Sequence, residues 1–95
     1  MRIKFEETNI FFTPNNKLQL LVYPNPALGN VNISGNFNGT AILKIYNASG
    51  QIVYENKNAS NQEIINVRSF TAGMYIYQVV TADHRQKSGK LIIFH

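Results

Sequence analysis

The sequence predicts an all-β fold, a seven-stranded antiparallel β-sandwich. Short runs of β-branched and aromatic residues alternate with segments rich in Gly, Asn, Pro and Ser, and helical periodicity is hard to find. The runs begin roughly 9 to 13 residues apart, which is the strand spacing expected of a sandwich. The predicted strands cover residues 18–23, 31–34, 40–46, 51–55, 63–67, 74–81 and 86–94.

Length and composition limit the chain to one modest domain. Its 95 residues are 44% hydrophobic and include no cysteine. A chain of this size buries about two-thirds of its unfolded surface, which is enough for a single core. The lack of cysteine excludes a disulfide framework, a cysteine-ligated metal and a thiol nucleophile. We expect the sandwich at residues 18–95, and a linker or the remnant of a preceding segment at residues 1–17.

No targeting or membrane-spanning segment is readable in the sequence. Glu6 and Glu7 stand where a signal peptide needs apolar residues, and no apolar run approaches the ~18 residues of a membrane span. We therefore expect no stable membrane insertion. If the chain is exported, its export signal is missing here or lies elsewhere in the chain.

Proline, asparagine and glycine mark the first joints between strands. Pro24 and Pro26 end the first strand, because each lacks a backbone donor and fixes φ near −65°. Asn25 is held extended by the proline that follows it. Gly29 then helps to turn the chain into the second strand.

Two further turns follow in order. Residues 36–39 supply an Asn-Gly turn between the second and third strands. Residues 47–50 close a hairpin between the third and fourth strands, and Gly50 adopts the left-handed conformation at little cost.

Alternation within the strands predicts which side chains are buried. Ala41, Leu43 and Ile45 share one face of the third strand. The strand at 74–81 is apolar on both faces, which favours a central position in its sheet, and the end of the strand at 86–94 is apolar on both faces as well.

A corner motif precedes the sixth strand. Phe70 is followed three residues later by Gly73, and Tyr75 stands at the start of a long strand. In immunoglobulin-like sandwiches a tyrosine in this place donates its hydroxyl to the preceding loop. We therefore predict an immunoglobulin-like sandwich in which Tyr75 makes this bond.

Four sequence blocks occur in a fixed order. They are Y-P-N-P-A-L-G-N-V-N-I at 23–33, I-Y-N-A-S-G-Q-I-V at 45–53, G-M-Y-I-Y-Q-V at 73–79 and K-S-G-K-L-I-I at 87–93. Together they resemble the type A C-terminal sorting domain of the type IX secretion system, over essentially the whole folded part. One departure is the ending Phe94-His95, where members of that family often have a further basic or polar residue.

The resemblance implies a non-catalytic sorting signal. In Bacteroidetes such domains direct an attached cargo protein from the periplasm through an outer-membrane translocon. A sortase-type peptidase commonly removes them, so that the cargo is anchored at the cell surface or released. The chain would then be a substrate of that peptidase and not an enzyme, without cofactor or metal, and the cut would fall within residues 1–21.

The residues expected to matter form two groups. The group that shapes the loops and the corner is Pro24, Asn25, Pro26, Gly29, Gly50, Gly73 and Tyr75. The group expected to be recognised by a partner is Lys87, Lys90, Leu91 and Ile92. Residues 84–95 contain three basic residues and no acid, and an edge strand there would offer unpaired backbone groups for strand addition. Residues 91–94 can equally be a core strand whose loss unfolds the domain, and both interpretations can hold at once.

Other functions find less support in the sequence. The net charge of +4 comes from few basic residues, and most aromatic residues fall at core positions, so nucleic-acid binding is not expected. His84 and His95 make a poor metal site without cysteine, and no nucleophile elbow or phosphate-binding loop occurs. The better rival is a carbohydrate-binding or adhesive sandwich in which Tyr46 and Tyr54 stack on sugar rings, because the fold alone does not separate the two functions.

Overall fold

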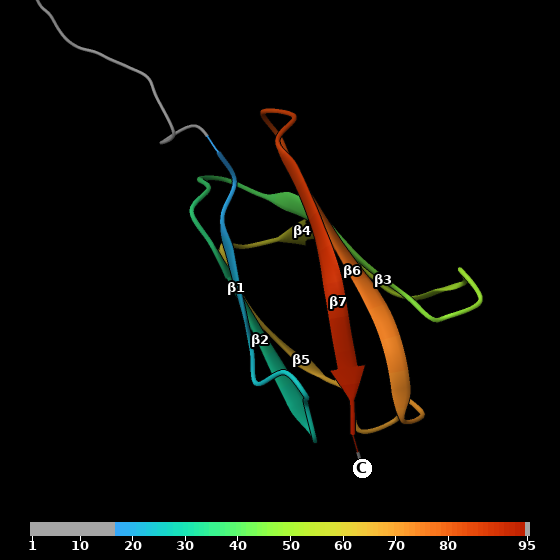
Figure 1. Ribbon diagram of the computed structural model, residues 1–95. Coiled ribbons are helices and arrows are strands. Elements are labelled where there is room, and N and C mark those ends of the chain that lie inside the picture. Colours follow the sequence, from blue (N-terminus) through green and yellow to red (C-terminus); the bar gives the residue numbers. More distant parts are fainter. Residues whose placement is uncertain (1–16, 95) are drawn as a thin grey trace, which may run out of the picture.

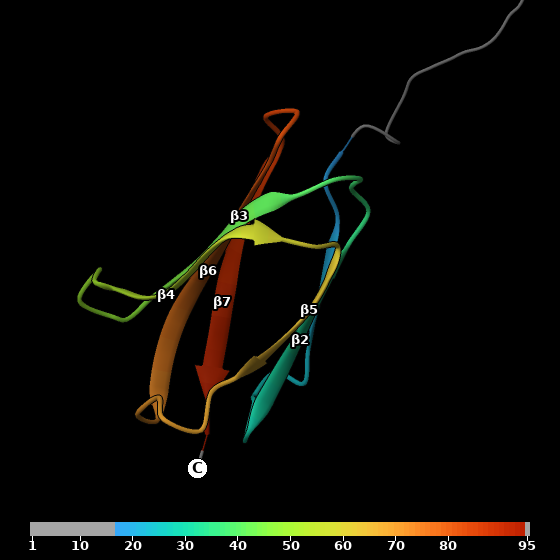
Figure 2. The same ribbon diagram turned by 180° about the vertical axis from the view of Figure 1, so that it is seen from behind.

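The computed structural model describes residues 17–94, which form a sandwich of two antiparallel sheets (Figures 1 and 2). Its seven strands are β1 (Leu20–Tyr23), β2 (Asn30–Gly35), β3 (Ala41–Tyr46), β4 (Ile52–Ala59), β5 (Gln62–Asn66), β6 (Gly73–Thr81) and β7 (Gln86–Ile93). Each overlaps one predicted strand, so the predicted seven-stranded sandwich is confirmed. In this part of the chain no helix is long and apolar enough to cross a membrane.

The two sheets differ in size and order. The three-stranded sheet has the order β1-β2-β5, and the four-stranded sheet has the order β4-β3-β6-β7. Strand β6 lies between β3 and β7, which confirms the central position predicted from its two apolar faces. Strand β7 stands at an edge of its sheet, and one of its long sides faces away from β6.

The core lies between the inner faces of the two sheets. Ala41, Leu43 and Ile45 are buried there, as the alternation of β3 predicts. In β6 the inner face is formed by the buried side chains of Tyr75, Tyr77 and Val79. The second apolar face of β6, which includes Met74 and Ile76, is exposed on the outside of the sheet.

The length of β4 differs from the sequence prediction. Strand β4 continues to Ala59, beyond the predicted end at residue 55, and Asn56 pairs with Leu43 in its ladder. Its polar second half has low strand propensity, but β4 is an edge strand, where polar side chains reach water. The turn at 36–39 connects β2 to β3, as predicted, and it crosses between the two sheets because these strands belong to different ones. Gly39 has a φ of +74°, which is the conformation that its turn requires.

Candidate functional site

The candidate recognition element is β7, at the edge of the four-stranded sheet. One side of β7 pairs with β6 along its whole length, from Gln86 opposite Val80 to Ile93 opposite Gly73. Along an antiparallel edge strand, residues direct their backbone groups alternately toward the neighbouring strand and toward the open side. The open side of β7 is therefore where another chain segment can pair.

The Y-P-N-P loop occupies part of this open side. Asn25 donates its side-chain N–H to the Lys90 carbonyl oxygen at 2.9 Å, and its amide oxygen accepts from the Ile92 backbone N–H at 3.0 Å. A side-chain amide carries the same donor and acceptor groups as a peptide unit. Asn25 therefore pairs with β7 as a neighbouring strand would, and Pro24 and Pro26, each preceded by a cis peptide bond, flank it.

Ala27 continues the contact with β7. Its N–H donates to the Ile92 carbonyl oxygen at 2.8 Å, and its carbonyl oxygen accepts from the Phe94 N–H at 2.8 Å. Ala27 and Ile93 form a parallel bridge, and Ala27 is fully buried. The first and last sequence blocks are thus joined by hydrogen bonds across 65 residues of chain.

The first half of β7 keeps its outward backbone groups unpaired within the described residues. Since Ile92 directs its N–H and C=O to the loop, the two-residue alternation places those of Ser88 and Gln86 on the same open side. No hydrogen bond from residues 17–94 reaches these groups. Lys87 and Lys90 are exposed along this half, and neither forms an ion pair with another described residue.

The four residues expected to form a recognition surface therefore divide. Lys87 and Lys90 present exposed side chains on the unpaired half of the edge. Leu91 is instead wholly buried opposite Tyr75, because the alternation of β7 turns its side chain inward. Ile92 is half-buried, and its backbone is already bound by the loop. Of these four residues, the two lysines are the ones with exposed side chains.

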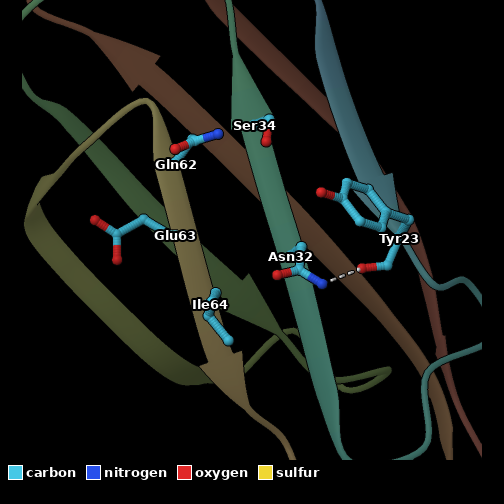
Figure 3. Close-up of a pocket in the computed structure, with 6 residues that line it drawn as sticks. All are labelled: Tyr23, Asn32, Ser34, Gln62, Glu63 and Ile64. Carbon is cyan, nitrogen blue, oxygen red and sulfur yellow. Dashed lines mark hydrogen bonds between the residues drawn. The ribbon is translucent and has the colours of Figure 1, made fainter.

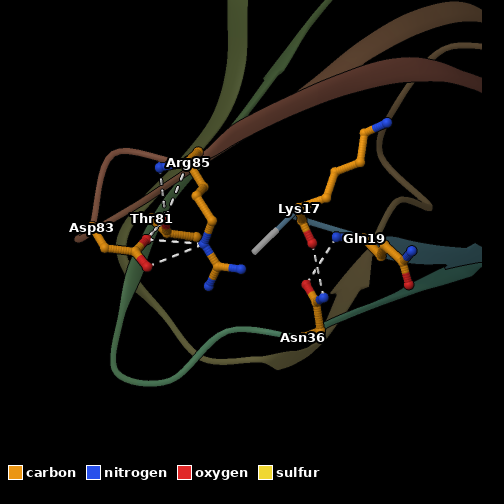
Figure 4. A network of polar contacts seen from close by, with 6 residues as sticks. All are labelled: Lys17, Gln19, Asn36, Thr81, Asp83 and Arg85. Carbon is orange, nitrogen blue, oxygen red and sulfur yellow. Dashed lines mark hydrogen bonds and ion pairs between the residues drawn. The ribbon is translucent and has the colours of Figure 1, made fainter. Parts of the chain in front are cut away.

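The third cation of this region, Arg85, is engaged in the turn between β6 and β7 (Figure 4). Its Nε donates to both carboxylate oxygens of Asp83, at 3.2 and 3.1 Å, and the Thr81 hydroxyl also donates to Asp83. The bond from Thr81, followed by that from Arg85, holds the pKa of Asp83 below its usual value. His84 lies in the same turn with a φ of +69°, and no cluster of metal-binding side chains occurs within residues 17–94.

The residues expected to shape the corner lie together at the start of β6. The Tyr75 hydroxyl donates to the Thr71 carbonyl oxygen at 2.7 Å, which is the bond expected of a tyrosine corner. The Phe70 ring packs beside it, with ring centroids 5.4 Å apart. Gly73 has a φ of +149°, a conformation that residues with a Cβ rarely adopt.

The I-Y-N-A-S-G-Q block is a hydrogen-bonded turn. The Asn47 side-chain oxygen accepts from the N–H groups of Ser49 and Gln51, at 3.0 Å each, and Gly50 donates its N–H to the Asn47 carbonyl oxygen. Gly50 has a φ of +87°, as the predicted left-handed turn position requires. Gly29 contributes through its backbone instead: its carbonyl oxygen accepts a hydrogen bond from the Val67 N–H at 2.9 Å.

The tyrosines considered for sugar stacking are not arranged for it. Tyr54 points inward and packs against the core, and the half-buried Tyr46 donates its hydroxyl to Gln78 at 3.3 Å. Tyr23 is the more exposed ring, at 44%. It borders a shallow pocket on the outer face of the three-stranded sheet, together with Asn32, Ser34, Gln62, Glu63 and Ile64 (Figure 3).

Two residues that the sequence did not single out also hold the site together. A Cβ on Gly89 would overlap the Tyr77 ring, 2.5 Å from its Cζ, so only glycine lets this tyrosine lie across β7. A glycine inside a strand is the available sequence signal of such a close approach. Asn36 accepts from the Gln19 N–H at 2.8 Å and donates to the Lys17 carbonyl oxygen at 3.0 Å (Figure 4). Nothing in the sequence pattern indicates these long-range bonds.

Fold and contacts together define an immunoglobulin-like sandwich. Its first sequence block binds the last strand, its second closes the turn between β3 and β4, and its third forms the corner at the start of β6. Residues 21–94 match the family of secretion system C-terminal sorting domains. The chain therefore belongs to this family, and it is a sorting domain of the type IX secretion system.

Two known proteins resemble the chain. The ulvan lyase NLR42 of Nonlabens ulvanivorans is 38% identical over 73 residues, which are 76% of this chain and 14% of that enzyme. PorZ, described as an essential bacterial surface component of the type IX secretion system of Porphyromonas gingivalis, shares the fold with a TM-score of 0.68 and 22% identity. That match covers 80% of this chain and 11% of PorZ, so the chain spans a small part of either relative.

Membership of the family has direct consequences. Sorting domains of this kind are non-catalytic, and any catalytic part of such a protein lies elsewhere. A sorting domain acts on a fused cargo and interacts with the secretion machinery, which exports the cargo to the cell surface or the extracellular space.

Proposed function

We propose that the outer-membrane translocon recognises the unpaired half of β7, residues 86–90, by adding a strand to it. The open backbone groups of Gln86 and Ser88 give such a strand its hydrogen bonds. Lys87 and Lys90, with no ion partner in the described chain, favour an acidic strand and set its register. The observation that carries this proposal is that the open backbone groups of Gln86 and Ser88 lie beside two lysines without an ion partner among the described residues.

A sortase-type peptidase would then remove the domain by cutting before Lys17. A peptidase needs an extended, accessible segment, and the chain from Lys17 onward is bound into the sandwich. Leu18 is 4% exposed, and Asn36 binds the backbone of Lys17 and Gln19. These contacts support a cut before Lys17, within the region of residues 1–21 that the family resemblance implies. The domain would meet the translocon from the periplasm and the peptidase after export.

The experiment is a reporter protein fused ahead of the full chain, in a host with the secretion system. We expect surface delivery of the reporter with the wild-type chain, and a several-fold loss with Lys87→Glu and Lys90→Glu combined. Lys57→Glu is the matched control, because Lys57 is an exposed lysine on the opposite edge strand β4. Normal delivery by the folded double variant would contradict recognition through the two lysines.

A second candidate, carbohydrate binding, is favoured by one observation. The exposed Tyr23 ring borders a pocket with the amides of Asn32 and Gln62 and the hydroxyl of Ser34, which suits stacking and hydrogen bonding to a neutral sugar (Figure 3). A glycan array comparing the wild-type chain with Tyr23→Ala tests it. Binding that the variant loses would support a sugar site, and no binding by the wild-type chain would exclude one on that array.

A further inference from the structure

The open edge of β7 consists of two halves of different character. Residues 86–90 read Q-K-S-G-K, with two charges and a glycine, whereas residues 91–94 read L-I-I-F, with neither charge nor proline. An apolar segment of high strand propensity on an open edge is a template for pairing with another chain. The apolar half is the half that the Y-P-N-P loop covers.

Without this cover the apolar half would present both backbone groups and side chains to a partner. The loop occupies the Lys90 and Ile92 carbonyl oxygens and the N–H groups of Ile92 and Phe94. The outer face beside it is apolar: Phe94 is 61% exposed, and Met74, which pairs with Ile92, is 44% exposed.

A second copy of this chain is the partner best suited to that edge. Two β7 strands can pair antiparallel about a two-fold axis, because such a contact uses the same surface on both copies. Centred on residues 91–94, the pairing would join apolar side chains. Centred on residues 86–90, it would place the lysines of both copies on one short ladder, and like charges near one another across strands are unfavourable.

We propose that Asn25 and Ala27 form an edge guard: their hydrogen bonds to β7 keep residues 91–94 from pairing with the β7 of a second copy. This edge guard is a property of the isolated chain and does not depend on the secretion machinery. Its further consequence, that strand addition is confined to residues 86–90, rests on the proposed function. Asn25 acts through its side-chain amide, which occupies the place that a neighbouring strand would take beside β7.

The test uses Asn25→Ala in the full chain. We expect the Ile92 amide to exchange its hydrogen about tenfold faster or more, as loss of one hydrogen bond implies. We also expect a concentration-dependent dimer or larger assembly in sedimentation, under conditions in which we expect the wild-type chain to stay monomeric. Asn47→Ala is the matched control: it removes three side-chain hydrogen bonds from a turn outside β7, so it lowers stability without exposing the guarded edge.

A second-site change shows whether the association runs through β7. Adding Ile92→Lys to Asn25→Ala places a charge on the exposed edge and should restore the monomer. If Asn25→Ala does not fold, Asn25→Asp replaces it, since the carboxylate still accepts from Ile92 but repels the Lys90 carbonyl oxygen. Whichever Asn25 variant is used, we expect it to self-associate and the Asn47→Ala control to stay monomeric.

The outcomes separate the guard from the proposed recognition. A folded Asn25 variant with fast exchange at Ile92 that stays monomeric overturns the guard, whatever its delivery in cells. Equal association by Asn47→Ala also overturns it, because general destabilisation would then suffice. Normal surface delivery by the Lys87→Glu, Lys90→Glu chain removes recognition by the lysines and leaves the guard untouched.

Discussion

Gly73 begins β6 with a φ of +149°, and the space around it is open. No atom outside the neighbouring residues lies within 4 Å of a Cβ built there, so the Cβ itself would not clash. The cost of Gly73→Val therefore comes from the backbone conformation, about 1–3 kcal/mol. Chemical denaturation should show this decrease in the free energy of unfolding.

Gly29→Ala is the control for this substitution. Gly29 has no positive φ, and its Cβ would meet only the flexible Arg68 side chain, at 3.3 Å. We expect a smaller change in unfolding free energy than for Gly73→Val. Equal stability of the Gly73→Val chain and the wild-type chain would contradict a strained position.

Local chemistry made some single residues predictable. The Tyr75 hydroxyl bonds to a carbonyl four residues away, and the φ of Gly50 follows from a four-residue turn, so both lie within the reach of a sequence pattern. Asn25 bonds to residues 65 and 67 positions away. Its partner depends on how two sheets pack, and a sequence pattern marks the loop without indicating what it touches.

At the scale of elements, the turn between β6 and β7 depends on the charge of Asp83. Its folded pKa lies below the unfolded value, so its bonds to Thr81 and Arg85 contribute stability above the unfolded pKa. That contribution is lost as the pH falls through the folded pKa. Thermal unfolding of the wild-type chain and Asp83→Asn should therefore differ at neutral pH and converge in acid. A difference that is constant down to pH 2 would contradict this account of the turn.

The strands themselves followed from alternation and from the positions of Pro, Gly and Asn. The exception is the second half of β4, where Asn56, Lys57 and Asn58 have little strand propensity and pairing with β3 decides the conformation. The apolar end of β7 was open to two interpretations, edge or core. The structure places Leu91 in the core, and the outward backbone groups of Ile92 are bound by Asn25 and Ala27. That loss of this segment unfolds the domain stays a prediction.

At the scale of the whole molecule, the sandwich begins before its first strand. Leu18 is buried and the backbone of residues 17 and 19 is held by Asn36. A chain shortened to begin at Lys17 keeps Leu18 and both hydrogen bonds to Asn36, so it is the reference for a shorter one. A chain that begins at Leu20 should lose about 1.5–3 kcal/mol, which is the worth of one buried leucine. Equal unfolding temperatures for the two shortened chains would show that Leu18 contributes nothing.

The contact between Asn25 and β7 ties the first loop of the sandwich to its last strand. Ribosomes make β7 after every other strand of the domain. The hydrogen bonds of Asn25 to β7 therefore form, and Lys87 and Lys90 are presented, only after synthesis of the domain has finished. Early termination or degradation from the carboxyl end would remove the segment that the loop holds and, with it, the buried Leu91 and Ile93. The proposed recognition strand is therefore present only when the whole sandwich has been translated. A secretion machinery that binds this strand would select cargo proteins that carry a complete sandwich.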